Sequence, residues 1–477
     1  MRHNFASRRN FLAASLAGVT ALGLMPKRAA AADAVVGIPV RAPTTSGQFR
    51  EIEHDLPLIK DADVIICGAG PAGVTAAICA ARAGAKVRLF EAHGSLGGVW
   101  TSSLLGYLLD FDKPGFNQEL VKRLREREAI LGQGMNGLCY HPEEMKVLLE
   151  ELCLAAGVVV QMHTRVAAAY RDGRTLQTIV TESKSGRQAW QASVFIDATG
   201  DGDLGAQAGC NFEIGESVNC PCQPLSMCAL LLVKDATALN GIVRNMGSGG
   251  SGHTQAKQAF LADIRRAGIE PSYGMPTLFP IRDNLVLTMM NHEYRINATD
   301  AAAVSAATIN ARGELHRIVR GLRKLGGGWD GVQIVATPEQ IGIRDGRRIR
   351  GRYVVEKNDL VSGIRHPDAV VRATFPVDVH ALTPADKPYS GLGVKVLPYD
   401  IPLRALIAKD VDGLLMAGRC ISGDFIAHAS YRVTGNAVAM GEAAGATAAC
   451  AVLSKRQVHE VPWNDVSPFI AKIRQPG

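Results

Sequence analysis

The feature that most constrains this chain is a strand, a glycine-rich turn and a helix that follow one another without interruption. Residues 63–67 (Asp-Val-Ile-Ile-Cys) form a short apolar run of the kind found in buried parallel strands. The G-x-G-x-x-G sequence of residues 68–73 follows directly, and an alanine-rich helical pattern then extends through Arg82. Residues 86–90 predict a second strand that ends at Glu91. The sequence therefore predicts a βαβ unit and a parallel sheet.

Three glycines of this turn have separate tasks if the unit binds a dinucleotide. Gly68 permits the tight turn, Gly70 leaves room for a pyrophosphate to approach the backbone, and Gly73 allows close helix packing. The helix N-terminus supplies free N–H groups for the phosphates. Glu91 can accept hydrogen bonds from both ribose hydroxyls. Because strand, turn, helix and terminal acid occur together, we interpret the unit as a dinucleotide-binding site and not as a simple glycine turn.

Two later segments also join an apolar strand to a glycine turn. Residues 194–196 lead into the acidic turn 197–203 (Asp-Ala-Thr-Gly-Asp-Gly-Asp), and residues 413–419 contain the second such pair. An alanine- and glycine-rich helical pattern follows over residues 435–453. The acidic turn lacks the spaced ligands and final Glu of a calcium loop, and we predict no metal site.

These segments resemble the FAD-dependent oxidoreductases, flavoproteins with two dinucleotide-binding domains. The small-residue loop 94–101 after Glu91 resembles their extended first motif, and Ala-Thr-Gly-Asp-Gly-Asp at 198–203 resembles their second motif. The resemblance also includes residues 341–349, 375–380, 417–422 and 439–445. It extends over residues 61–453 and implies FAD as the cofactor.

The resemblance implies a set of FAD-binding residues in the three motifs and in one intervening strand. Around Asn436 and Ala437, the start of the C-terminal helix could direct N–H groups at the flavin N1 and C2=O edge, where negative charge develops on reduction. The expected FAD-binding residues are Gly68, Gly70, Pro71, Ala72, Gly73, Glu91, Gly97, Gly98, Val166, Thr199, Gly200, Asp201, Gly418, Arg419, Asn436 and Ala437.

We predict an α/β fold with a Rossmann-like, doubly wound FAD-binding domain and an inserted mixed β/α substrate domain. The FAD-binding domain comprises residues 61–209 and 401–455, and the substrate domain, residues 210–400, lies between these two segments in the sequence. A tail follows at 456–477. In this architecture a substrate would bind between the inserted domain and the flavin.

Three residues are candidates for catalysis. His428 lies between the third motif and the C-terminal helix, and histidine suits a general base near neutral pH. Arg432 could hold a carboxylate or another anionic oxygen by a two-pronged hydrogen bond. His380 is a second candidate base. The alternative interpretation is that both histidines are ordinary hydrogen-bonded structural residues.

The first 32 residues have the composition of a removable export signal. Arg8 and Arg9 precede Phe-Leu and an apolar run to Met25, and Ala30, Ala31 and Ala32 then stand directly before Asp33. This pattern resembles a bacterial twin-arginine signal, with an ordinary Sec signal or a membrane anchor as the alternatives. It predicts export by the twin-arginine translocase to the periplasm, with residues 33–60 as a linker.

The charge of the chain depends strongly on this segment. Without residues 1–32, which hold five basic and no acidic residues, the formal charge falls from +7 to +2. The sequence therefore predicts no nucleic-acid partner. The helical pattern 435–453 is nearly long enough to span a bilayer, but Glu442 and its small residues favour packing inside the protein, so we expect no stable membrane span in the mature chain.

Together these features predict an exported FAD-dependent dehydrogenase that oxidises a small organic substrate by hydride transfer to flavin N5. No second G-x-G-x-x-G unit for NAD(P)H is visible, and a periplasmic enzyme lacks a nicotinamide pool, so a quinone, a cytochrome or oxygen is the expected electron acceptor. The alternatives are a flavin-dependent C=C reductase, a monooxygenase, or a flavin-binding electron-transfer or accessory subunit. The chain has no G-x-S-x-G, H-E-x-x-H or P-loop sequence, which argues against hydrolases and kinases.

Overall fold

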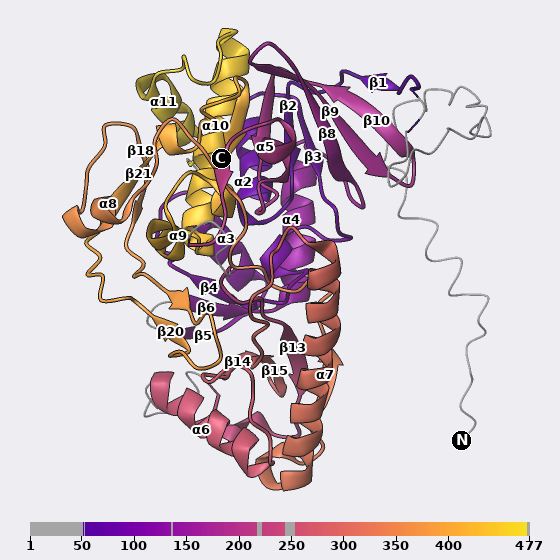
Figure 1. The fold of residues 1–477 in the computed structure, drawn as a ribbon, viewed down its shortest axis with the longest axis vertical. Helices are drawn as coiled ribbons and strands as arrows, with labels where there is room; N and C mark the ends of the chain where they lie inside the picture. The colour runs from indigo at the N-terminus through magenta and orange to yellow at the C-terminus, as the bar shows by residue number, and fades with distance from the viewer. Residues whose placement is uncertain (1–50, 52, 135–136, 217–221, 244–252, 475–477) are drawn as a thin grey trace, which may run out of the picture. The chain divides into compact units, whose positions relative to one another are not determined.

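A five-stranded parallel sheet forms the centre of the fold (Figure 1). Its strands lie in the order β22 (Leu414–Met416), β11 (Val194–Asp197), β2 (Val64–Cys67), β3 (Val87–Phe90) and β7 (Val159–Gln161). All four neighbouring pairs are parallel. Strands β2, β11 and β22 consist entirely of buried residues, as expected where both faces of a sheet are covered. The predicted α/β fold is confirmed, and the three motif strands are neighbours in it.

The computed structural model describes residues 51, 53–134, 137–216, 222–243 and 253–474. All described helices and strands belong to one unit, Leu56–Gly477. The predicted export signal, residues 1–32, lies outside the described residues, and so does the predicted linker up to residue 50.

Helices α2 (Pro71–Arg82) and α10 (Thr434–Ser454) pack against each other at very short range. A Cβ atom added to Gly441 would lie 2.2 Å from the carbonyl oxygen of Ala72. One added to Gly445 would lie 2.3 Å from a carbonyl oxygen one turn further along α2. Since no side chain fits at these distances, the two glycines allow the backbones of the helices to touch.

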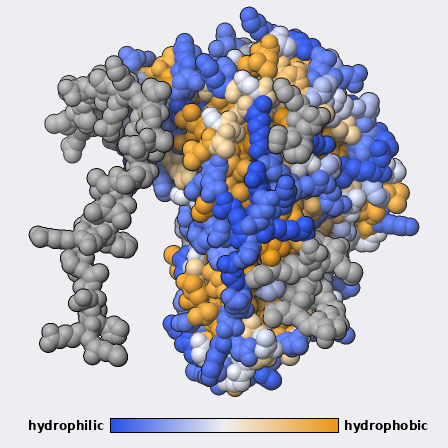
Figure 2. Space-filling view, turned by 180° about the vertical axis from the view of Figure 1, so that it is seen from behind, coloured by the Kyte–Doolittle hydropathy of each residue, from blue (hydrophilic) through white to orange (hydrophobic). Residues whose placement is uncertain are grey.

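Among the described residues, α10 is the one helix long and apolar enough to cross a membrane. Within its apolar window, however, 83% of the positions are buried inside the protein. The apolar character of α10 therefore serves its packing against α2 and the parallel sheet. On the face turned away from the view of Figure 1, Figure 2 shows hydrophilic side chains interspersed with hydrophobic ones.

A second sheet packs against the parallel one. Its four strands lie in the order β1 (Leu58–Ile59), β10 (Gly186–Gln191), β9 (Thr175–Ser183) and β8 (Arg165–Asp172). Trp190 of β10 contacts Phe90 of β3 edge to face, with ring centroids 5.0 Å apart. This contact packs β10 of the second sheet against β3 of the parallel sheet.

A separate hydrophobic core lies in the inserted part of the chain and extends from Leu225 to Ile341. Its sheet is antiparallel, and helices α6 and α7 pack on it; in Figure 1 these elements lie below the parallel sheet. The order of strands is β14 (Thr277–Arg282), β15 (Leu285–Met289), β13 (Cys228–Leu232) and β16 (Gln333–Ala336), with α6 at His253–Arg266 and α7 at Ala301–Leu325.

The chain returns to the first core earlier than the predicted inserted domain, 210–400, implies. Ile349, Val355 and Tyr399 all belong to the core around the parallel sheet. The antiparallel pair of β18 (Ala369–Ala373) and β21 (Tyr399–Pro402) contributes Val371 and Ile401 to the same core.

The remaining elements connect these layers. The helices are α3 (Phe116–Glu126), α4 (Pro142–Ala155), α5 (Asp203–Gln207), α8 (Lys357–Ser362), α9 (Phe425–Tyr431) and α11 (Trp463–Ile473). The strands are β4 (Tyr107–Leu109), β5 (Ile130–Gly134), β6 (Gly137–Tyr140), β12 (Phe212–Glu213), β17 (Arg348–Ile349), β19 (Val379–His380) and β20 (Tyr389–Ser390).

Candidate functional site

A cavity of about 450 Å³ lies at the carboxyl ends of the parallel strands. Cys67 and Phe90, the last residues of β2 and β3, line it. So do Ala198 and Ala417, which directly follow β11 and β22. Ligands of open α/β sheets bind outside the carboxyl ends of the strands, so this cavity is the candidate functional site.

Most of the residues expected to bind FAD meet at this cavity. They come from all three predicted motifs and from β8. The thirteen that line it are Gly68, Gly70, Pro71, Ala72, Glu91, Gly98, Val166, Thr199, Gly200, Asp201, Gly418, Arg419 and Ala437.

The other three expected residues lie behind the lining. A Cβ on Gly73 would lie 1.9 Å from the carbonyl oxygen of Gly68, so Gly73 holds the helix close to the turn. The N–H of Gly97 donates to the carbonyl oxygen of Ala69 at 2.8 Å and thereby supports the turn from outside the cavity. Asn436 is fully buried and does not line the cavity.

The glycine turn leaves a space that fits a pyrophosphate. Gly70 lines the cavity, and a Cβ atom added to it would meet no atom of the described residues within 4 Å. Gly70 is also the N-cap of α2, and no side chain caps this helix end. The N–H groups of the first turn are therefore left for a ligand with negative charge.

Glu91 is held rigidly at the end of β3. Its Oε2 accepts a hydrogen bond from the N–H of Ala69 at 2.7 Å, and its Oε1 accepts one from the N–H of His93 at 2.9 Å. The carboxylate is nearly buried and lines the cavity. Each of its oxygens keeps a further lone pair, which is what two ribose hydroxyls require.

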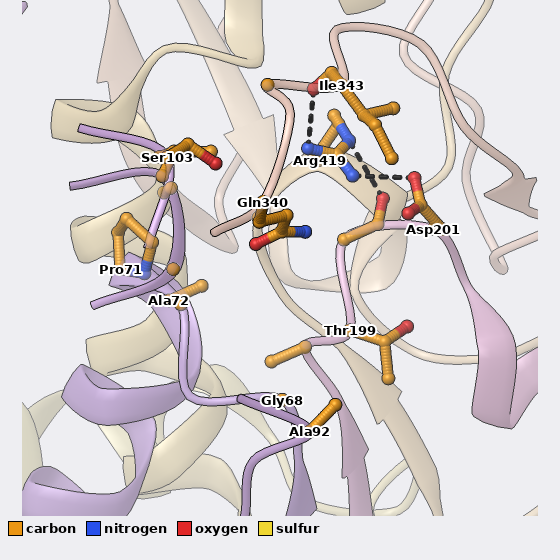
Figure 3. Close-up of a pocket in the computed structure, with 18 of the residues that line it drawn as sticks. Gly68, Pro71, Ala72, Ala92, Ser103, Thr199, Asp201, Gln340, Ile343 and Arg419 are labelled. Carbon is orange, nitrogen blue, oxygen red and sulfur yellow. Dashed lines mark hydrogen bonds and ion pairs between the residues drawn. The ribbon is translucent and has the colours of Figure 1, made fainter. Parts of the chain in front are cut away.

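Arg419 joins three distant segments at the cavity wall (Figure 3). Its Nη2 donates to Oδ1 of Asp201 at 2.6 Å, and its Nε donates to the carbonyl oxygen of Gly200 at 3.0 Å. Its Nη1 donates to the carbonyl oxygen of Ile343 at 2.8 Å. The guanidinium therefore fixes the third motif against the second and against the segment that follows the inserted sheet.

The N-terminus of α10 also faces the cavity. Val433 is its N-cap, no side chain caps it, and Val433, Thr434 and Ala437 line the cavity. The hydroxyl of Thr434 is buried and has no hydrogen-bond partner among the described residues. Uncapped N–H groups and a free hydroxyl fit an oxygen-rich ligand edge, such as the N1 and C2=O edge of a flavin.

Comparison with known proteins settles the family. Residues 63–474 match the family model described as FAD dependent oxidoreductase. The chain belongs to this family. The predicted cofactor, FAD, is thereby confirmed. The groups that fit it are the glycine turn at residues 68–73 (the glycine cradle), Glu91 and the uncapped N-termini of α2 and α10.

Solved structures with a similar arrangement have low sequence identity. A geranylgeranyl bacteriochlorophyll reductase-like protein from Thermoplasma acidophilum is 15% identical, with 87% of this chain and 82% of that chain covered and a TM-score of 0.43. OxyS anhydrotetracycline hydroxylase from Streptomyces rimosus is 12% identical (87% and 66% covered, TM-score 0.45). The p-nitrophenol 4-monooxygenase PnpA from Pseudomonas putida DLL-E4 is 10% identical (88% and 85% covered, TM-score 0.42). No curated protein sequence matches the chain.

Sequence reasoning missed the part of the cavity wall that comes from the inserted sheet and its neighbours. Residues 341–349 are similar to a family segment, but the pattern gave no role for an individual side chain. The missed lining residues include Ser103, Ser226, Cys228, Met289, Gln340, Ile343 and Arg344. The pairing of β13 with β15 brings Cys228 opposite Met289, and no local sequence signal indicates this register.

His428 does not reach the cavity. It lies in α9, its side chain is fully buried, and it is absent from the cavity lining. Burial and the nearby charges of Arg348 and Arg432 lower the pKa of His428 well below its ordinary value. This position argues against the predicted role of His428 as a catalytic base: α9 turns its side chain into the core, whereas Arg432, which directly follows α9, lines the cavity.

His380 also lies outside the cavity lining, in a buried chain of hydrogen bonds. Its Nδ1 lies 3.2 Å from Nε2 of His292, and its Nε2 lies 3.3 Å from Oδ2 of Asp378. Burial and the positive charge of Arg344 lower the pKa of His380 to about 3. The ring is therefore neutral at pH 7 and a poor match for a general base, which favours the structural interpretation of this residue.

Asp197 connects the parallel sheet to the second motif. Its Oδ1 accepts hydrogen bonds from the N–H and the hydroxyl of Thr199, at 3.1 and 2.7 Å. Its Oδ2 accepts one from the N–H of Gly205 at 2.8 Å. Burial outweighs these contacts and raises the pKa of Asp197 from 3.8 to about 6.

This pKa predicts a pH dependence of stability. Because the folded state binds the Asp197 proton more tightly than the unfolded state, stability falls as pH rises from about 4 to about 6 and is level above that. The stabilisation lost amounts to roughly 3 kcal/mol. Urea unfolding measures the free energy of unfolding of the wild type and of Asp197→Asn at each pH. The difference, wild type minus variant, should decrease by this amount between pH about 4 and about 6. A difference that stays constant with pH would contradict the prediction.

Proposed function

We propose that this FAD-dependent oxidoreductase oxidises a small organic molecule by hydride transfer to flavin N5. The observation that carries the proposal is the composition of the cavity wall. It continues without interruption from the glycine turn to side chains of the inserted sheet, among them Cys228 and Met289. A cavity that joins a nucleotide cradle to a second sheet can hold a cofactor and a second molecule together.

The chain's own groups at the inserted-sheet end bind and orient the substrate. FAD, when bound, supplies the hydride acceptor. Arg344 and Arg432 offer hydrogen-bond donors there, and Met289 and Val433 offer apolar surface. Burial raises the pKa of Cys228 to about 12, so its thiol is neutral. These groups position the substrate, and the proton that it loses together with the hydride passes to water, because neither His428 nor His380 lines the cavity.

We further propose that electrons pass to a quinone, a cytochrome or oxygen, and that the enzyme works in the periplasm. The twin-arginine pattern of residues 1–32 supports export. The FAD-binding segments extend from Gly68 to Ala437 in the sequence, so the protein must be folded before it holds the cofactor. A route that transports folded proteins suits that requirement.

The test is an anaerobic substrate screen on the yellow holoprotein, read at the flavin absorbance band. We expect one class of organic substrate to bleach the band, and an artificial quinone to restore it, whereas NAD⁺ does not. Reduction by NADPH alone, with no organic reductant effective, would instead identify a reductase or a monooxygenase. A flavin that no organic substrate and no nicotinamide reduces would identify an electron-transfer subunit.

A further inference from the structure

Arg344 lies at the cavity wall with no carboxylate of the described residues within ion-pair distance. Its Nη1 donates to the carbonyl oxygen of Pro224 and to the hydroxyl of Ser226, both at 2.7 Å, and its Nη2 lies 3.5 Å from the sulfur of Met289. None of these partners is charged, and Arg344 forms no ion pair with any residue that the structure describes. A buried cation of this kind is costly unless an anion joins it.

Arg432 lies beside it with part of its donor capacity unused. Its Nη2 donates to the carbonyl oxygen of Asp378 at 2.7 Å and to Oε1 of Gln223 at 3.3 Å. Its Nε and the Nε2 of Gln223 are buried without a hydrogen-bond partner in the described part of the chain. Two unsatisfied donors next to an unpaired guanidinium require an acceptor that the described residues do not supply.

The other charges around this site are already paired. Asp378 lies 3.6 Å from Arg432, Asp201 is bound by Arg419, and Asp345 pairs with Arg348 at 3.2 Å. The neighbouring His380 is neutral, because its pKa is lowered to about 3. Among these described residues, Arg344 is therefore the cation that has no carboxylate within ion-pair distance.

The ionisation of the two arginines supports this account. Burial and the charge of Arg432 lower the pKa of Arg344 to about 10, while Asp378, Tyr273 and Cys228 act in the opposite direction. Burial likewise lowers the pKa of Arg432, against the attraction of Asp378 and Asp345. Both groups still carry a proton at pH 7, and a bound anion would relieve the cost of that charge.

We propose that the substrate of this enzyme is an organic carboxylate whose anionic group is bound by Arg344 and Arg432 at the inserted-sheet end of the cavity. The inference rests on the proposed function, which it narrows to a substrate class. A guanidinium binds a carboxylate through two parallel hydrogen bonds. Cys228 and Met289 next to Arg344 provide apolar contact for the rest of the molecule.

The cofactor's phosphates are the other possible source of negative charge. The glycine cradle around Gly70 lies in the first motif, whereas Arg344 donates hydrogen bonds to Pro224 and Ser226 beside the inserted sheet. We therefore assign the two arginines to the substrate. The assignment predicts that removal of Arg344 leaves FAD bound.

The first measurement uses wild-type holoenzyme and uncharged analogues. Propionate, succinate and benzoate are titrated against the flavin absorbance spectrum, each beside its own amide. We expect saturable perturbation by at least one carboxylate, and binding of the matching amide that is about 30-fold weaker or more, because a hydrogen bond to a charged group is lost. Equal binding of acid and amide, or no perturbation by any of the three acids, overturns the proposal.

The second measurement uses variants. Arg344→Gln should weaken the binding of the carboxylate that perturbs the wild-type spectrum by about 30-fold or more, with the FAD-to-protein ratio unchanged. The affinity of Arg344→Lys for that carboxylate should lie between those of Arg344→Gln and the wild type. Arg350→Gln is the matched control, since Arg350 pairs with Glu213 away from the cavity. A lower FAD-to-protein ratio in Arg344→Gln, with wild-type carboxylate affinity in the fraction that still holds FAD, would assign Arg344 to the phosphates and overturn the proposal. None of these outcomes requires turnover, so they are distinguishable from a failure of the proposed function.

Discussion

Replacement of Gly70 by alanine should lower the affinity for FAD by as much as about 100-fold while the apoprotein stays folded. Gly70 has φ −67° and ψ −175°, which alanine adopts without strain. The added Cβ would meet no protein atom within 4 Å and would instead enter the cavity, where the pyrophosphate must approach the backbone. Steric overlap of one carbon with a tightly bound ligand costs about 1–3 kcal/mol, which corresponds to as much as about a 100-fold loss.

Two other glycines provide the comparison. Gly313 lies in α7, and a Cβ there would meet only Nη1 of Arg317 at 3.7 Å, so Gly313→Ala should leave FAD binding unchanged. Gly73→Ala should instead disrupt the turn, since its Cβ would lie 1.9 Å from a carbonyl oxygen. The measurements are the FAD-to-protein ratio, the dissociation constant for added FAD, and the melting temperature of each apoprotein. A Gly70→Ala protein that retains one FAD per chain would refute the assignment of the cradle.

The parts of this fold that could be predicted are those with a local signal. A short apolar strand followed by a glycine turn is recognisable within a few residues, and it occurs at Cys67, Asp197 and Met416, the ends of three neighbouring strands. Because carboxyl ends of parallel strands meet at one edge, three segments distant in sequence converge on one cavity. Glu91 was predictable for the same reason, since it directly follows β3.

The residues that could not be predicted depend on packing between distant segments. His428 and Arg432 are four positions apart, yet the first points into the core and the second lines the cavity, a difference set by the orientation of α9. Arg344 becomes a site residue only because the segment before β13 pairs Ser226 with Gly342 and so brings the Ser226 hydroxyl beside Arg344. Likewise, no composition change marks Ile349, where the chain re-enters the first core.

Removal of the Arg474 side chain should destabilise the protein by roughly 2–3 kcal/mol. The carboxylate of Glu442 is almost fully buried in the middle of α10. Its Oε2 accepts a hydrogen bond from Nε of Arg474 at 2.9 Å, and its Oε1 accepts one from the N–H of Phe116 at 3.3 Å. Loss of one partner of a buried ion pair costs about 3–5 kcal/mol, and the partial exposure of Arg474 reduces that figure.

A control can separate the stability that Arg474→Ala loses through Glu442 from the effect of removing any arginine near the C-terminus. Arg456→Ala removes an arginine from an exposed pair with Asp465 and should cost about 1 kcal/mol or less. If the unpaired charge of Glu442 is the cause, Glu442→Gln added to Arg474→Ala should recover much of the stability, because a neutral amide is less costly to bury. The measurement is the free energy of unfolding in denaturant of the wild type, Arg474→Ala, Arg456→Ala and the double variant. Equal losses for Arg474→Ala and Arg456→Ala, with no recovery in the double variant, would mean that α11 stabilises α10 by apolar contact alone.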